Sequence, residues 1–159
     1  MAVQPKYREL TTLELKELEK EFIDYLIVNG ITADDWVKIK EEQQEKAEDI
    51  ITLFSDVILE GVLRKVRFLE YRSKSDIKAF QCLGEKMILM GMSTEDEAID
   101  FTDDSVFQNA DLNNGKGVKV YTSEKAYSLT REEELFQMIQ SGCHISDGQS
   151  FKAISLALV

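Results

Sequence analysis

The stretch VRFLEYRSKSDIKAFQCLGEKMILMGM, residues 66–92, decides the fold. It contains three runs rich in aromatic and aliphatic residues, at 66–72, 76–83 and 86–92, separated by the short polar breaks SKS and GE. Such runs with brief breaks are typical of strands joined by tight turns, so we predict a meander of three antiparallel strands. The third run alternates least between apolar and polar residues. We therefore expect it to be the central or most buried strand.

Helical patterns precede these strands. Residues 10–15 (LTTLEL) form a capping-box sequence, with Thr11 as the N-cap and Glu14 three residues later. An apolar stripe continues from this start and predicts a single helix that ends before Gly30. A longer amphipathic pattern covers 45–65. Its predicted apolar face comprises Ala47, Ile50, Ile51, Phe54, Val57, Ile58, Gly61 and Val62.

The only tryptophan, Trp36, follows two aspartates in GITADDWVKIK, residues 30–40. These residues could form a site in which carboxylates lie beside an aromatic ring. They could instead form a helix corner, with Thr32 as the N-cap and with Asp34 and Asp35 in the first turn. We favour the corner, because each residue then has a local structural role and a large aromatic side chain is usually packed.

A strongly acidic stretch follows the strands. Residues 93–111 contain seven acidic residues and no basic one. We predict an acidic loop that runs into a short helix capped by Thr102, with Asp103 and Asp104 in its first turn. An acidic run of this kind indicates either solvation or the binding of a basic partner. The candidate partner-binding residues are Glu95, Asp96, Glu97 and Asp100.

The remaining chain has a mixed pattern. Residues 118–122 predict a short strand, and 123–128 suggest one helical turn. A helix capped by Thr130 should end at Gly142. The tail from position 149 is predicted as a last helix, although its apolar residues could also pair as a strand. The whole chain thus predicts an α+β fold: an N-terminal helical hairpin and a long helix packed on a small antiparallel sheet, then a mixed helical C-terminal part.

Composition bounds the function. The 30 acidic and 19 basic residues give a net charge of −11, which argues against general binding to nucleic acid or to an anionic membrane surface and favours a basic protein surface as partner. The length suits one domain, residues 1–159. The chain has no GxSxG, Walker A, GxGxxG or HExxH motif.

Cysteine and histidine add no chemistry. Cys82, Cys143 and His144 are too few for a zinc site, and a thiol nucleophile would need a base that faces it. We therefore predict no catalytic residues, no metal ligands and no cofactor. Two cysteines are too few for a disulfide framework, and no apolar run is long enough to span a bilayer. We therefore expect a cytoplasmic protein with reduced thiols.

Three functions remain open. The first is a non-enzymatic interaction or regulatory protein for a basic partner, and it is our preference. The second is a carboxylate-metal hydrolase that uses Asp100, Asp103 or Asp104. The third is a nucleic-acid-binding platform on the sheet, which the acidic flanks make unlikely. Its residues would be Arg67, Phe68, Tyr71, Arg72, Lys74, Lys78, Phe80 and Lys86.

Four segments carry a family resemblance. They are KYRELT (6–11), EFIDYLIVNGITADDWVKIK (21–40), FSDVILEGVLRKVRFLEYRS (54–73) and FQMIQSG (136–142). With them the chain resembles an uncharacterised family of small acidic bacterial cytoplasmic proteins that has no assigned activity. The resemblance implies a bacterial setting and a single α+β domain, and it transfers no functional residue.

Overall fold

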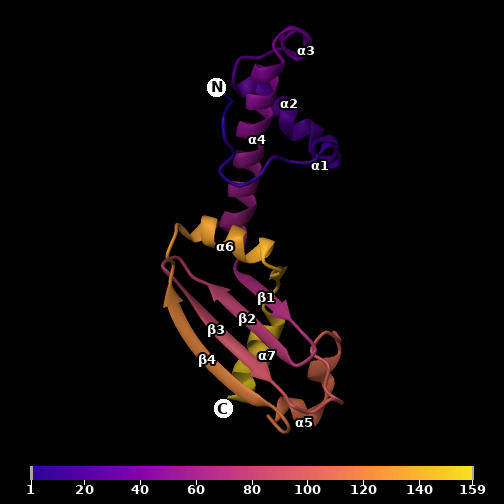
Figure 1. Cartoon of the computed structure of the whole chain (residues 1–159), viewed down its shortest axis with the longest axis vertical. Coiled ribbons are helices and arrows are strands. Elements are labelled where there is room, and N and C mark those ends of the chain that lie inside the picture. Colours follow the sequence, from indigo (N-terminus) through magenta and orange to yellow (C-terminus); the bar gives the residue numbers. More distant parts are fainter. Residues whose placement is uncertain (1, 159) are drawn as a thin grey trace. The chain divides into compact units, whose positions relative to one another are not determined.

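The computed structural model describes residues 2–158, apart from the side chain of Ala110. The chain forms two compact units, one that ends at Val62 and one that begins at Leu63. The first unit is helical, and the second contains a five-stranded antiparallel sheet with further helices (Figure 1). The predicted α+β class is therefore confirmed. The organisation as a single domain stays a prediction. No helix within residues 2–158 is long and apolar enough to cross a membrane.

Two helices of the first unit begin where the predicted capping signals lie. The helices of this unit are α1 (Thr12–Glu17), α2 (Glu19–Val28), α3 (Ala33–Glu42) and α4 (Gln44–Lys65), the last of which continues into the second unit. Both predicted N-caps are confirmed. The amide of Glu14 donates to the Thr11 hydroxyl at 3.2 Å, and the amide of Asp35 donates to the Thr32 hydroxyl at 3.1 Å. The interpretation of residues 30–40 as a helix corner is thus confirmed for the Thr32 N-cap and for the start of α3.

The segment before α1 is anchored along α4, which the sequence did not indicate. The amide of Tyr7 donates to the Asp56 carboxylate at 3.1 Å, and that of Leu10 donates to the Ser55 hydroxyl at 2.9 Å. Ala47 and Phe54 of the predicted face of α4 are buried, but the buried surface also includes residues outside that face. Thr52, Ser55 and Leu63 are buried. By contrast, Val57, Gly61 and Val62 are exposed.

The predicted single helix is divided at Leu18, whose φ of −102° and ψ of 23° depart from helical values. The anchored segment sets the direction in which α1 starts. Packing on α4 sets the direction of α2, because the ring of Phe22 lies 5.0 Å from that of Phe54. The chain bends between these two constraints, so the prediction of one continuous helix was wrong.

The second unit is built on one antiparallel sheet with the order β4-β3-β2-β1-β5. Its strands are β1 (Phe68–Arg72), β2 (Asp76–Cys82), β3 (Lys86–Ser93), β4 (Lys119–Ala126) and β5 (His144–Ser146). The predicted meander is confirmed as β1–β3, but the central strand is β2 rather than β3. The helical turn expected at 123–128 was wrong, because β4 pairs with β3 as far as Ala126, which lies opposite Lys86.

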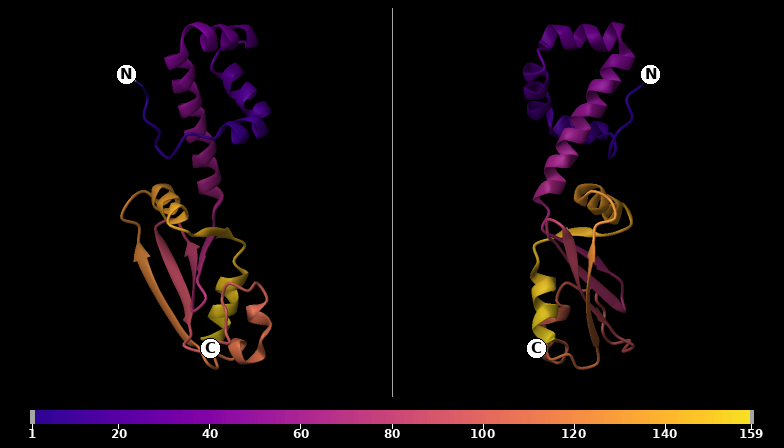
Figure 2. Two further views of the ribbon diagram at one scale, coloured as in Figure 1. Left: turned by 45° about the vertical axis from the view of Figure 1, so that its right-hand side comes forward. Right: turned by 90° about the vertical axis from the view of Figure 1, so that its left-hand side faces the viewer.

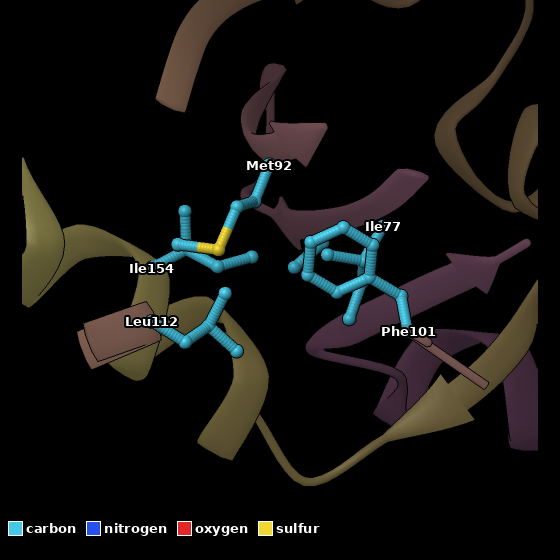
Figure 3. Close-up of a cluster of buried hydrophobic side chains, with 6 residues drawn as sticks. Ile77, Met92, Phe101, Leu112 and Ile154 are labelled. Atoms are coloured by element: carbon cyan, nitrogen blue, oxygen red, sulfur yellow. The ribbon is translucent and has the colours of Figure 1, made fainter. Parts of the chain in front are cut away.

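The helices of this unit are η1 (Val106–Gln108), α5 (Ala110–Asn113), α6 (Arg131–Gln140) and α7 (Gln149–Ala157). The tail is thus a helix, as predicted. Figure 2 shows α7 against one face of the sheet, where it contacts β2 and β3. The side chains of Ile77, Met92 and Ile154 meet there with those of Phe101 and Leu112, and all five are buried (Figure 3). Through Phe101, this core fixes the middle of the acidic stretch.

One side chain of helix α6 makes several hydrogen bonds to the sheet and its flanks. The Arg131 guanidinium donates to the carbonyl oxygens of Leu63 at 3.0 Å and of Cys82 at 3.2 Å. It also donates to the carbonyls of Leu83 and Val66. One residue therefore holds the end of α4, the entry to β1 and the end of β2 together.

Candidate functional site

The acidic loop, residues 94–105, connects β3 to η1. Two apolar side chains hold it on the unit, since Phe101 is buried in the core and Ile99 packs against that core. The loop is also tied at its start, where the Thr94 hydroxyl donates to the Gly117 carbonyl at 2.7 Å. These contacts show that the segment is not a flexible surface tail. The loop is an ordered structure that displays acidic side chains.

Three aspartates shape this loop from within. Each carboxylate accepts a hydrogen bond of 2.9 Å from the backbone amide two residues further along, a turn that Asp side chains commonly stabilise. These residues are Asp96, Asp100 and Asp103. The hydrogen bonds from Thr102 lower the pKa of Asp100, and those from Ser105 lower the pKa of Asp103. The hydrogen bonds therefore favour the ionised form of Asp100 and Asp103.

Thr102 does not cap a helix, so that prediction was wrong. Its amide and its hydroxyl both donate to the Asp100 carboxylate. Asp103 and Asp104 precede η1 instead of lying in its first turn. The buried Phe101 explains the difference, because its amide donates to the Lys74 carbonyl at 3.0 Å and the chain must turn around this fixed point.

The four predicted partner-binding residues divide into two kinds. Asp96 and Asp100 are used by the loop itself, as described above. Glu95 and Glu97 are exposed, and within residues 2–158 neither side chain has a hydrogen bond or an ion pair. Only these two leave their carboxylates wholly available to a partner. The prediction did not separate the two kinds because it counted charge alone, although Asp side chains commonly accept from the amide two residues ahead.

The carboxylates of the loop do not converge. Those of Asp100 and Asp103 turn back to their own hydroxyl neighbours. The side chain of Asp104 is fully exposed and lies 3.8 Å from the Arg72 guanidinium. Across the described part of the chain, no group of three or more His, Cys, Asp or Glu residues could hold a metal ion. The arrangement lacks the convergent oxygen ligands that hard cations require.

The proposed nucleic-acid platform is split between the two faces of the sheet. Alternate residues of a strand point to opposite faces, and Phe68 packs on Phe151 of α7, with ring centroids 5.6 Å apart. Tyr71 belongs to the opposite face, together with Lys78 and Phe80, by the register of β1 and β2. Phe68 and Arg72 are thus separated from Tyr71, Lys78 and Phe80, so the proposed platform does not form one continuous surface.

The two thiols are poor nucleophiles at neutral pH. Burial raises the pKa of the Cys82 thiol to about 11, and burial also raises the pKa of Cys143. Catalytic cysteines need the reverse shift, because the thiolate is the reactive form. His144 begins β5 and is exposed. This pair offers no activated thiol.

A cleft of the second unit has a volume of about 890 Å³ and lies between β1, β5, the acidic loop and the start of α7. Sequence analysis missed it, although Glu70 and Arg72 are charged residues at strand positions that face the core. Arg72 pairs with Glu70 and donates to the Ser150 hydroxyl and the Phe101 carbonyl, both at 3.1 Å. Its guanidinium thus links β1, the loop and α7, and this structural role occupies most of its donors.

Fold and site together define a class: an acidic α+β protein with an ordered acidic loop and no converging catalytic groups among residues 2–158. The chain belongs to a family of unknown function, DUF6495, which it matches over residues 1–158. The predicted relation to an uncharacterised family is thereby confirmed. Comparison with curated proteins found no match, and comparison with solved structures found none either.

Proposed function

We propose that the protein is a non-enzymatic interaction or regulatory protein that binds a basic protein surface through its acidic loop. One observation carries the proposal. Glu95 and Glu97 are exposed and have no partner within residues 2–158, although the backbone that displays them is fixed by hydrogen bonds. A fixed backbone lowers the ordering cost of binding, so unpaired charges on it can contribute to recognition.

The net charge of −11 supports the same proposal at longer range. Charge of one sign attracts an oppositely charged partner before contact and raises the association rate, and salt weakens this effect. We also propose that the interaction takes place in the bacterial cytoplasm. Its support is that Cys82 and Cys143 are both free thiols, as expected where thiols stay reduced.

The test compares two double variants with the same loss of charge. Glu95→Gln/Glu97→Gln removes the two free carboxylates of the loop. Glu48→Gln/Glu85→Gln removes two exposed carboxylates elsewhere, again without a hydrogen bond or ion pair among residues 2–158. Asp96 is left intact, because its carboxylate accepts the Ala98 amide at 2.9 Å and shapes the loop.

Each protein is immobilised and exposed to extract of its native cell, and captured proteins are identified by mass spectrometry. We expect basic proteins that wild type and the control variant retain but the loop variant loses. With such a partner purified, its association rate should fall by about threefold to tenfold at low ionic strength and by less at high salt. If both double variants capture the same proteins equally well, the loop is only a solvated surface and the proposal fails.

A further inference from the structure

Helices α2 and α3 are joined by a short turn (Figure 2). Residues of both helices line an apolar groove of about 390 Å³. Its floor includes Phe22, Leu26 and Trp36. The Phe22 and Trp36 rings contact edge to face, with centroids 5.1 Å apart. The side chains of its walls are large, apolar and exposed: Ile23 at 47%, Ile27 at 64% and Val37 at 47%.

The helix corner does not account for these walls. The caps at Thr32 and Asp35 and the packing of Trp36 are complete without them. Single exposed apolar residues are normal on any protein. Here three of them line one concave surface, and Val28 beside them is 84% exposed. Contiguous exposed apolar surface of this kind marks an interaction site.

Charge indicates what the groove accepts. Fifteen acidic and seven basic side chains give residues 1–62 a formal charge of −8. The residues three or four positions from Ile23, Ile27 and Val37 lie beside them on the same helices. Four of these neighbours are acidic and two are basic. They are Glu19, Asp24, Asp34 and Glu41, against Lys20 and Lys40.

We propose that this groove binds an amphipathic helix of a partner protein, whose apolar face enters the groove while its lysine- or arginine-rich polar face meets the acidic rim. Amphipathic helices bind grooves in this way through residues spaced by three and four. The 10 residues of α2 span roughly 15 Å, which suits about three turns of a bound helix. A second copy of this chain fits less well, because it would bring another unit of charge −8 to the groove.

Trp36 makes the proposal directly measurable, because it is the only tryptophan of the chain and lies in the groove. The probe is a tryptophan-free peptide of about four helical turns, with leucine along one face and lysine elsewhere. Its twin carries glutamate in place of each lysine. We expect the lysine peptide to shift the Trp36 emission in a saturable way, and the glutamate peptide to leave it unchanged.

Two substitutions separate groove binding from simple charge attraction. Ile27→Asp adds a carboxylate to the groove wall, whereas Val57→Asp adds one at a 56% exposed position of α4 outside the groove. Both residues are exposed, so both variants should fold, which circular dichroism checks. Binding in the groove predicts an affinity about tenfold weaker for Ile27→Asp and unchanged for Val57→Asp.

Three results would overturn the proposal. Attraction to charge alone would leave both variants binding the lysine peptide as tightly as wild type, or more tightly. Equal binding of the glutamate peptide would show that the acidic rim does not discriminate between basic and acidic helices. A concentration-dependent dimer in sedimentation, lost in Ile27→Asp and kept in Val57→Asp, would assign the groove to a second copy. Because Glu95 and Glu97 take no part here, this proposal and that for the acidic loop can fail separately.

Discussion

At the scale of single residues, local hydrogen bonds could be predicted from the sequence, whereas long-range ones could not. The N-caps Thr11, Thr32 and Thr130 were predictable, because each cap bonds to an amide three residues ahead in the sequence. Arg131 was not. Its four carbonyl partners lie 48 to 68 residues earlier in the chain, so no sequence spacing reveals them.

Arg131→Lys should therefore be costly although it keeps the charge. The planar guanidinium serves several carbonyls at once, whereas an ammonium reaches fewer and would leave buried acceptors unpaired. We expect the free energy of unfolding to fall by about 2–4 kcal/mol in urea titrations. Arg67→Lys is the matched control, since Arg67 is exposed, and it should change stability by less than about 0.5 kcal/mol. Equal effects of the two substitutions would remove the clamp role of Arg131.

At the scale of elements, the strands with strong apolar runs were predictable and the weaker ones were not. β1, β2 and β3 follow one another in the sequence, so short turns and composition suffice to find them. The extension of β4 beyond position 122 consists mostly of exposed residues and depends on the edge of β3 for its hydrogen bonds. β5 has three residues, too few for any periodic pattern, and exists because β1 offers it an edge.

The pairing of β3 with β4 contains a close contact that can be tested. Gly91 lies opposite Tyr121, and a Cβ at Gly91 would stand 2.1 Å from the tyrosine ring. The ring cannot move freely, because its hydroxyl donates to the Asp76 carboxylate at 2.5 Å and accepts from the Lys78 ammonium at 3.3 Å. Gly91→Ala should therefore destabilise by about 1–3 kcal/mol.

The double variant Gly91→Ala/Tyr121→Ala provides the control. Without the ring, the added methyl group meets no obstacle, so Gly91→Ala should cost much less in the Tyr121→Ala background than in wild type. Chemical denaturation of the four proteins measures the difference. Additive costs would show that the glycine is required by the backbone and not by the ring.

At the scale of the whole molecule, the helical and strand patterns predicted an α+β chain but could not predict two compact units. Their boundary falls inside the continuous helix α4, where no glycine-rich or proline-rich linker marks it. The function stayed equally hidden. The acidic run was visible in the sequence, but a count of charge does not distinguish its glutamates from the aspartates that accept local hydrogen bonds from amides two residues ahead.

We propose that the two units nevertheless unfold as one domain. Helix formation is cooperative, and α4 carries helical hydrogen bonding across the boundary between Val62 and Leu63. Trp36 fluorescence reports on the first unit, and the reactivity of the buried Cys82 thiol reports on the second once Cys143→Ser removes the other thiol. The two urea midpoints should coincide. Separate midpoints would show two independently unfolding domains.

The edges of the sheet have a consequence for molecules that meet at high concentration. β4 is a long edge strand whose outer backbone groups could recruit the same strand of another copy, the first step toward fibrous aggregates. Its side chains oppose that step, because Lys119, Glu124 and Lys125 would have to lose water as two such edges approached. On the other side, β5 offers too few backbone groups to template a growing stack. Neither edge of the sheet therefore favours strand pairing between copies of the protein at high concentration.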